Sequence, residues 1–201
     1  MKILKEKKYN NVNFSEKDFS LTEIDFCVFE ECVFSNTTFV EASFLNSRFE
    51  KCIFANAKFN TGVLSRSQFN NCDFRGTDFF ISQFQDSRFI GSNFSYANMA
   101  GIAVKDCDFS YAIFRFQKLD EIDLSGSKFY SANFENASLK KCNLSRCDLS
   151  RCDFSFADLS GANITESDIK DANITGVNIK NLKIDVNQAI YYAMFNGAKL
   201  D

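Results

Sequence analysis

The stretch CDLSRCDFSFADLSGANITE, residues 147–166, holds four consecutive five-residue units that share one pattern. In each unit a small residue is followed by Asp or Asn, then by Leu, Phe or Ile, and then by two mostly polar residues. A period of five matches neither the 3.6-residue turn of a helix nor the two-residue alternation of a strand. The chain must therefore change direction once in every unit.

The same period extends through almost the whole chain. Every fifth residue from Leu4 to Ile184 is apolar, and all of them are Phe, Leu or Ile except Tyr9, Met99 and Val104. The residue two positions before each of these is nearly always Ala, Ser, Thr or Cys over residues 22–172. We call the two places in the unit the large position and the small position.

If each unit turns by about 90°, four units close a square coil of about 20 residues. The large and small positions lie on the same face of an extended backbone, so both point inward. Stacked coils would pair as in a parallel sheet, with each residue directly above the one 20 positions later. The sequence thus predicts an all-β solenoid, a parallel β-helix of about nine coils.

The small position is filled by a larger side chain at Ile102, Gln117 and Ile122, close to Met99 and Val104. Large side chains in a small position are expected to bulge the wall or widen two coils. The irregularity is either local repacking or part of a partner-binding site. Three aromatic residues in outward positions nearby could form a patch with it: Tyr111, Phe116 and Tyr130.

All eight Cys residues fall in the small position, which predicts that their thiols point into the core: Cys27, Cys32, Cys52, Cys72, Cys107, Cys142, Cys147 and Cys152. The spacing of five in the last three resembles a metal motif, but successive units face different sides of a coil. In-register side chains also point in parallel, which suits disulfide geometry poorly. We expect buried, unreactive thiols, with no metal site.

The composition argues against an enzyme. The chain has no His, so a Ser–His or Cys–His catalytic pair is impossible. It also has no glycine-rich phosphate loop. The acidic cluster Asp120, Glu121 and Asp123 is expected to lie at solvent-exposed corners of the coil rather than to form a catalytic pair. We therefore predict a binding protein with no catalytic residues and no cofactor.

The opening MKILKEKKYNN lacks the apolar stretch of a secretory signal, and no apolar run is long enough to span a membrane. We expect a cytoplasmic protein with reduced thiols and no membrane contact. Its formal net charge of −3 is unlike that of a nucleic-acid-binding protein, so no direct nucleic-acid binding is expected.

After residue 185 the pattern of five fails and a helix over about residues 186–196 is predicted. Asp185 and Gln188 have the spacing of a capping box, and Gly197 is a suitable C-terminal stop. We divide the chain into a β-helix over residues 1–185, with an irregular N-terminal cap over 1–13, and a terminal helix and tail over 186–201. The helix carries an apolar stripe that either caps the core or both caps it and forms a dimer: Ile190, Tyr191, Met194 and Phe195.

The units CDFRG (72–76), CDLSR (147–151), CDFSF (152–156) and ADLSG (157–161) resemble those of pentapeptide-repeat proteins. The resemblance covers residues 9–185. It implies a right-handed quadrilateral β-helix, in agreement with the square coil inferred from the spacing.

The segment TGVNIKNLKIDVNQA, residues 175–189, resembles the end of the Qnr and MfpA group of topoisomerase-protecting pentapeptide-repeat proteins. The matching residues are Lys183, Ile184, Asp185, Gln188 and Ala189. This resemblance implies a dimeric, DNA-mimicking rod that binds DNA gyrase or topoisomerase IV and relieves inhibition by quinolones or peptide toxins, as in antibiotic resistance. It also favours a homodimer through the helix. The phase of five is never interrupted, so the chain is most similar to the members without projecting loops.

A DNA mimic needs negative charge on its surface, and residues 16–50 are rich in acidic side chains. They form a candidate partner surface: Glu16, Asp18, Glu23, Asp25, Glu30, Glu31, Glu41 and Glu50. An acidic end would steer the rod toward a basic partner. The alternatives are a surface of ordinary mixed charge and a structural scaffold for protein–protein interactions.

Overall fold

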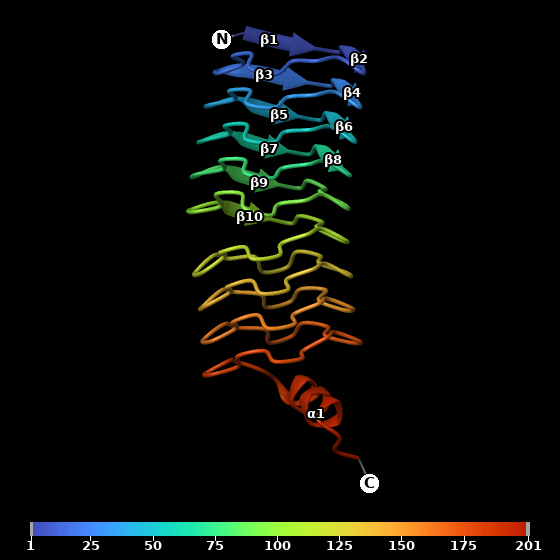
Figure 1. Ribbon diagram of the computed structural model, residues 1–201, viewed down its shortest axis with the longest axis vertical. Coiled ribbons are helices and arrows are strands. Elements are labelled where there is room, and N and C mark those ends of the chain that lie inside the picture. The colour runs from blue at the N-terminus through green and yellow to red at the C-terminus, as the bar shows by residue number, and fades with distance from the viewer. Residues whose placement is uncertain (1, 200–201) are drawn as a thin grey trace.

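A computed structural model describes residues 2–199, which form a stack of square coils followed by one helix (Figure 1). On the first side of each coil lies a six-stranded parallel sheet: β1 (Lys2–Lys5), β3 (Thr22–Asp25), β5 (Ser43–Leu45), β7 (Val63–Ser65), β9 (Gln83–Gln85) and β10 (Ala103–Lys105). On the second side lies a four-stranded parallel sheet: β2 (Lys8–Asn10), β4 (Val28–Glu30), β6 (Arg48–Glu50) and β8 (Gln68–Asn70).

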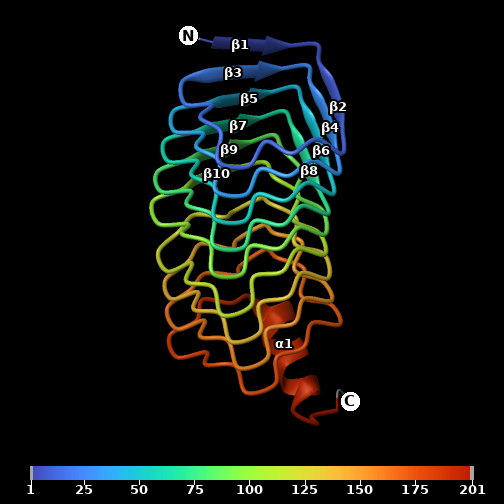
Figure 2. The same ribbon diagram turned by 45° about the horizontal axis from the view of Figure 1, so that its top comes forward.

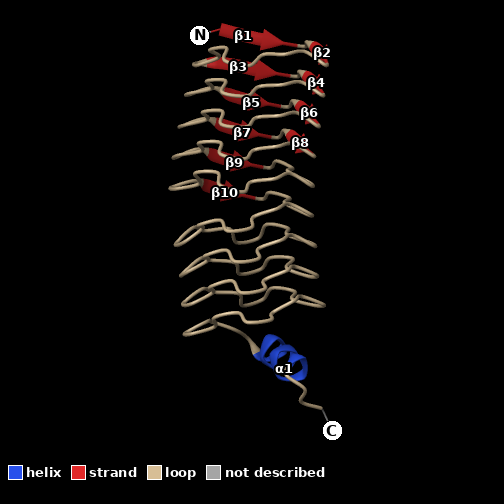
Figure 3. Ribbon diagram, viewed as in Figure 1, coloured by secondary structure: helices blue, strands red, loops and turns tan. Residues whose placement is uncertain are grey.

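Every pair in these sheets has the predicted register of 20, as in Leu4↔Ile24 and Tyr9↔Phe29. The third and fourth sides pair through single residues with the same register, beginning with Asn13↔Val33 and Asp18↔Thr38. Figure 3 shows that named strands stop at β10, while the coils continue. The right-handed quadrilateral β-helix with a C-terminal helix is therefore confirmed.

Two details differ from the prediction. The stretch built from named strands, β1 to β10, amounts to about five turns rather than nine, and single pairs carry the register on to Asn163↔Lys183. The irregular cap expected over residues 1–13 is wrong, because β1 and β2 pair regularly with the second coil. Ladder bonds use main-chain groups, so the first coil needs no small residue at Lys17, whose side chain is exposed.

The corners of the coils are made by left-handed residues. Every fifth residue from Glu6 to Asn181, at the last place of the unit, has a positive φ, with values from 49° to 73°. Asn and Gly tolerate this conformation, whereas bulky side chains are strained in it. The change of direction once per unit, inferred from the period, is this left-handed residue.

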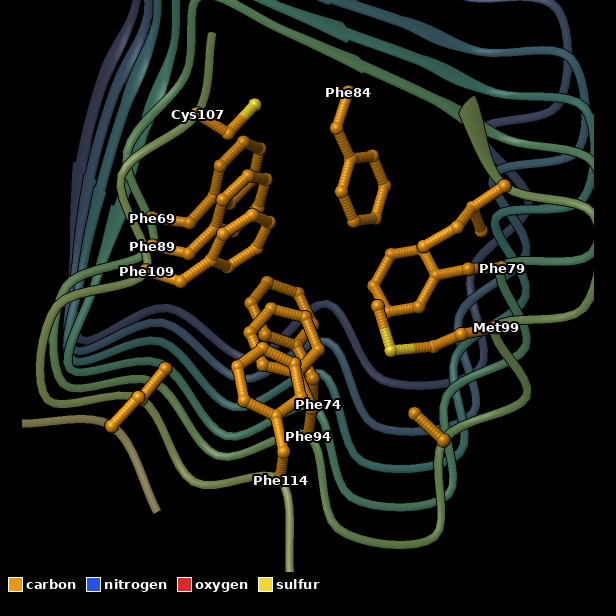
Figure 4. Packing of buried hydrophobic residues seen from close by; sticks show 14 of the residues in the cluster. Phe69, Phe74, Phe79, Phe84, Phe89, Phe94, Met99, Cys107, Phe109 and Phe114 are labelled. Carbon is orange, nitrogen blue, oxygen red and sulfur yellow. The ribbon is translucent and has the colours of Figure 1, made fainter. Parts of the chain in front are cut away.

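Columns of stacked rings fill the core (Figure 4). The ring centroids of Phe49 and Phe69, one coil apart, are separated by 4.7 Å and their planes differ by 2°. Rings on adjacent sides meet edge to face, as Phe49 and Phe54 do at 5.6 Å and 61°. Offset stacks and edge-to-face contacts are the favoured aromatic geometries. The aromatic columns end earlier on the fourth and first sides, where Met99 follows Phe79 in Figure 4.

Most small positions are buried, and most of their hydroxyl groups are hydrogen-bonded, with Ser127 as an exception. The Thr77 hydroxyl donates to the Phe54 carbonyl at 2.8 Å, and the Ser92 hydroxyl donates to the Phe69 carbonyl at 2.6 Å. A hydroxyl can replace a methyl group at such a position because a carbonyl of the coil above accepts its hydrogen bond.

The helix α1 (Val186–Phe195) has the predicted capping box. The Asp185 side chain accepts from the Gln188 backbone N–H at 3.2 Å, and the Gln188 side chain accepts from the Asp185 backbone N–H at 3.0 Å. Gly197 follows the C-cap with φ of 93° and donates to the Met194 carbonyl, as predicted for the stop.

Candidate partner-binding surfaces

The helix α1 is held on the last coils by polar contacts. Gln188 is buried, and its side-chain amide donates to the carbonyls of Ile164 at 2.6 Å and Ser167 at 2.8 Å. The Tyr191 hydroxyl donates to the Ala172 carbonyl at 2.9 Å. The carbonyls of Ser167 and Ala172 have no further coil to pair with, so these bonds cap the ladder rather than the apolar core.

The predicted apolar stripe is divided by this arrangement. Tyr191 lies on the coil, whereas Ile190, Met194 and Phe195 are exposed. The end of the core remains open beneath the helix, with an apolar cavity of about 70 Å³ between Tyr192 and the last core residues. Its lining includes Ile174, Val177, Ile179 and Leu182. The helix alone therefore covers the core end incompletely.

The C-terminal motif lies where the ladder becomes a helix. Lys183 makes the last rung, donating to the Ala162 carbonyl and accepting from the Ile164 N–H, and Ile184 is partly exposed. Asp185 also accepts from the Glu166 N–H, and the Ala189 N–H closes the first helical turn on the Asp185 carbonyl. Hydrogen bonds from the backbone of Glu166 and Gln188 lower the pKa of the Asp185 carboxyl. The motif sets where and at what angle the helix begins.

The eight predicted acidic residues do not form one surface. Glu23 and Asp25 lie on the first side, Glu30 and Glu50 at the second, and Asp18 on the fourth. The other three are corner residues: Glu16, Glu31 and Glu41. Residues five apart face different sides, and only residues 20 apart share a column, so an acidic stretch of sequence becomes a ring around the rod.

Basic partners neutralise part of this ring. Lys5 is 3.6 Å from Asp25, Arg48 is 3.1 Å from Glu30, and Lys51 is 3.8 Å from Glu31. Glu30, Glu31 and Glu50 remain together near the second side, where Glu30 and Glu50 are paired one above the other. This is the one part of the predicted acidic set that the structure gathers.

The wall of the rod is open over half a turn between residues 96–106 and residues 115–125, a feature we call the seam. Residues 96–106 form its upper lip and residues 115–125 its lower lip. On the second and third sides the ladder is continuous here, through Arg88↔Asp108↔Lys128 and Asn93↔Ile113↔Asn133. On the fourth side Asn98 does not pair with Lys118, and on the first side Ala103 does not pair with Asp123. Figure 2 shows the coils standing further apart here than elsewhere along the same corner, as Figure 1 does.

The residues in the small positions explain the seam. The Gln117 side-chain amide donates to the Ala97 carbonyl at 2.7 Å, which in a regular coil would accept from the Lys118 backbone N–H. Ile102 and Ile122 lie one above the other in the same column and are slightly exposed, at 7% and 8%. The widening predicted from these three residues is confirmed, because their volume and the Gln117 amide stand where ladder bonds would form.

The outward aromatic residues lie beside the seam in two groups. Tyr111 and Tyr130 are in contact at the corner between the second and third sides, with ring centroids 5.5 Å apart, and the Arg151 guanidinium lies 5.9 Å from the Tyr130 ring. Phe116 is at the next corner, with the Arg115 guanidinium 5.5 Å from its ring. Ile113 lies between the two corners. The predicted patch is therefore a band across the third side, partly covered by arginines.

A family model described as pentapeptide repeats matches residues 27–66, 46–79, 107–146 and 142–181, well over half of the sequence. The chain belongs to the pentapeptide-repeat family. The two matched regions flank residues 80–106, which include the upper lip of the seam. No curated protein matches the chain by sequence.

Solved pentapeptide-repeat structures share its fold. A trypsin-treated variant of QnrB1, a plasmid-mediated fluoroquinolone resistance protein, matches with a TM-score of 0.87 and 20% identity over 99% of both chains. Full-length QnrB1 matches with a TM-score of 0.78 and 20% identity over 95% of this chain and 100% of its own. HetL from Nostoc sp. strain PCC 7120, involved in heterocyst differentiation regulation, matches with a TM-score of 0.57 and 19% identity over 90% of this chain and 88% of its own.

The eight thiols of this pentapeptide-repeat protein are all buried, as predicted from their small positions. Burial raises the pKa of Cys107 and of Cys147 to about 12. Within residues 2–199 no group of three or more Cys, Asp or Glu side chains is arranged to hold a metal ion. Among these residues there is also no helix long and apolar enough to cross a membrane.

Two features of the surface were not found from the sequence. Tyr96 is exposed above Phe116 in the same corner row, and Phe156 lies further down that row. All three occupy the left-handed position, so a search for aromatic residues at the last place of the unit would have found them. The unpaired backbone of the seam has no signal in residue type and required the three-dimensional pairing.

Proposed function

We propose that this pentapeptide-repeat protein is a non-enzymatic, DNA-mimic-like rod that binds a type II topoisomerase, either DNA gyrase or topoisomerase IV. In doing so it modulates the enzyme or protects it from inhibitors such as quinolones or peptide toxins. The observation that carries the proposal is the match to QnrB1, which extends over the whole rod and the terminal helix. Fluoroquinolone resistance is a property of QnrB1, and we propose a related function for this chain.

Charge supports the proposal in one region. Near the N-terminal part of the second side, Glu30, Glu31 and Glu50 carry three negative charges against the two positive charges of Arg48 and Lys51, and the formal net charge of the chain is −3. Attraction between this group and a basic topoisomerase surface would act mainly on the association rate. Binding is therefore expected to weaken as ionic strength rises, because exposed charges are screened beyond about 10 Å at 0.1 M salt.

We further propose that the protein is a homodimer through α1 and the open core end. Exposed Ile190, Met194 and Phe195 and the apolar cavity beneath the helix support a second copy as the cover of this end. The double variant Met194→Asp, Phe195→Asp should give a monomer by light scattering, whereas Asn187→Asp, an exposed change near the start of the helix, should keep the dimer. A dimer of unchanged mass in the double variant would reject this contact.

The function is tested by supercoiling and cleavage-complex assays with purified gyrase and topoisomerase IV, each with and without a quinolone. We expect fewer cleavage complexes in the presence of the protein, or a dose-dependent change in supercoiling. The charge-reversal variant Glu30→Lys, Glu50→Lys should shift the dose dependence to higher concentration, and Asp168→Lys at the opposite end of the second side is the matched control. Unchanged enzyme activity over a wide concentration range would reject the topoisomerase proposal.

The alternative is a structural scaffold for an unrelated protein. It is favoured by the dispersal of the acidic residues around the rod and by their pairing with Lys5, Arg48 and Lys51. A protein that forms the dimer, folds stably and leaves both topoisomerases unaffected would support the scaffold instead.

A further inference from the structure

The seam exposes two facing rows of main-chain groups with no partner among residues 2–199. On its upper lip the backbone N–H groups of five residues donate to no acceptor: Tyr96, Met99, Gly101, Val104 and Asp106. On its lower lip the carbonyls that would accept them in a regular coil are also unpaired: Arg115, Lys118, Asp120, Asp123 and Ser125. Unpaired strand edges are templates for pairing with another chain.

The chemistry of the two lips selects the kind of partner. The upper lip offers mainly donors and the lower lip mainly acceptors, and in the described part of the chain the Ile102 carbonyl of the upper lip and the N–H groups of Lys118 and Asp123 of the lower lip are unpaired as well. An extended polypeptide can satisfy both, because its carbonyls can accept from the upper lip while its N–H groups donate to the lower lip. Neither a nucleic acid nor a lipid presents alternating donors and acceptors with this repeat.

The floor of the seam and one of its ends are apolar. Ile102 and Ile122 keep slight exposure in positions that are almost fully covered in regular coils. At the corner between the third and fourth sides, Tyr96 is 72% exposed on the upper lip and Phe116 is 52% exposed on the lower lip. These surfaces suit an apolar side chain of the partner.

The backbone at these two aromatic residues is left-handed. Tyr96 has φ of 63° and Phe116 has φ of 58°, a conformation that costs a bulky residue about 1–2 kcal/mol. Elsewhere in this row Asn36, Asn56, Gly76 and Asn136 tolerate the conformation, whereas Phe156 shares the strain away from the seam. Of these three rings, those of Tyr96 and Phe116 border the seam and are available to a segment bound there.

The opposite part of the lower lip is acidic. Asp120, Glu121 and Asp123 are close together there, and only Glu121 has a cationic partner, Lys141 at 2.9 Å. Asp120 accepts from the Ser138 hydroxyl, and Asp123 accepts from the Asn143 amide. A basic side chain on the partner would complement this end.

We propose that the seam binds an extended segment of a partner protein by main-chain pairing. An apolar side chain of that segment packs against Tyr96 and Phe116, and a Lys or Arg side chain lies by Asp120 and Asp123. The inference is independent of which protein supplies the segment, so it stands apart from the topoisomerase proposal.

The test begins with a library of random linear peptides panned against the full-length protein, with enriched peptides then synthesised and their affinities measured. We expect Tyr96→Asn with Phe116→Asn to weaken binding by about tenfold or more, the loss expected for aromatic anchors. Asn already occupies this corner row, so the variant should fold at least as stably as the parent. Phe156→Asn, in the same row but away from the seam, is the matched control and should bind normally.

A second variant tests the backbone. Replacing Ile102, Gln117 and Ile122 by Ala should let the lips approach and restore ladder bonds. Hydrogen exchange of residues 96–106 should then slow, and peptide binding should be lost. In the parent protein the bound peptide should protect the same amides.

Three results would overturn the proposal. They are a library that yields no peptide protecting residues 96–106, peptides that bind the aromatic variant as tightly as the parent, and peptides that bind the Ala variant unchanged after its ladder has closed.

Discussion

The coils immediately below the seam differ from the upper rod in their large positions, whereas the seam differs in its small positions. Below the seam the large positions of the fourth side change from Phe to Leu, as at Leu139, and the first side no longer contains Phe, as at Leu144, yet the ladder is complete. At the seam the small positions change, and the ladder opens over half a turn. The wall therefore tolerates a change of core residue throughout, whereas a large residue at the small position leaves the ladder intact only in the end coils, as at Lys17 and Leu182.

The physical reason lies in the distance of each position from the backbone. A Phe or Leu side chain reaches toward the centre of the coil, where neighbouring columns can repack around a change of shape. A side chain at the small position lies directly between the backbones of adjacent coils. Extra volume there pushes apart the main-chain groups that must approach within hydrogen-bonding distance.

Substitution of a large position should have the largest effect on the free energy of unfolding. Phe54→Ala should lower the free energy of unfolding by about 3–5 kcal/mol, because it leaves a cavity between stacked rings. Phe54→Leu should lower it by less than about 1.5 kcal/mol, with the ladder intact, as in the Leu-containing coils. Urea denaturation measures both changes. Equal losses for Leu and Ala would show that ring stacking, rather than volume, dominates this position.

A second seam can be created in a regular coil. Ala57→Ile places a large side chain in a fully buried small position and should lower the free energy of unfolding by about 1–3 kcal/mol. Amides of Lys58 and Asp78, which donate to the coil above, should exchange faster. Ala57→Ser is the control, since Ser fills this position elsewhere. Unchanged exchange in the Ile variant would contradict the explanation of the natural seam.

The C-terminal end offers a smaller test. Gln188→Ala removes two buried hydrogen bonds to the last coil and one side of the capping box, and should cost about 1–2 kcal/mol. Far-ultraviolet circular dichroism should show loss of the helix before the coils unfold. Asn187→Ala, at an exposed neighbouring residue, should retain the helix. Loss of coils and helix together would indicate that α1 is needed for the stability of the whole rod.

Thiol labelling should detect the difference between the seam and the regular coils without any substitution in the protein. In native protein at neutral pH all eight should react slowly with a thiol reagent, because they are buried and burial holds the pKa of Cys107 at about 12. Cys107 follows directly after the seam and should become reactive before Cys152, which lies in a regular region and whose pKa burial also raises. Urea should expose all eight. Rapid labelling of a regular coil in native protein would contradict the tightly closed wall.

Much of the architecture could be predicted from the spacing of residue types. The alternation of small and large residues places both kinds inside, and Asp185, Gln188 and Gly197 fix the limits of the helix. The acidic surface could not be obtained in this way, because a run of acidic residues is wound around all four sides of the coil. The open core end under Tyr192 was also hidden, since an apolar stripe on a helix does not reveal how much of it the coils cover.

The sequence by itself determined the period, the direction in which each residue faces and the place where the coils become irregular. These follow from local rules that repeat every five residues. Tertiary structure decided which main-chain groups remain unpaired at the seam, which aromatic residues border it and which acidic residues lie together. Those properties depend on contacts between residues 20 apart, and such contacts exist only after the coils have stacked.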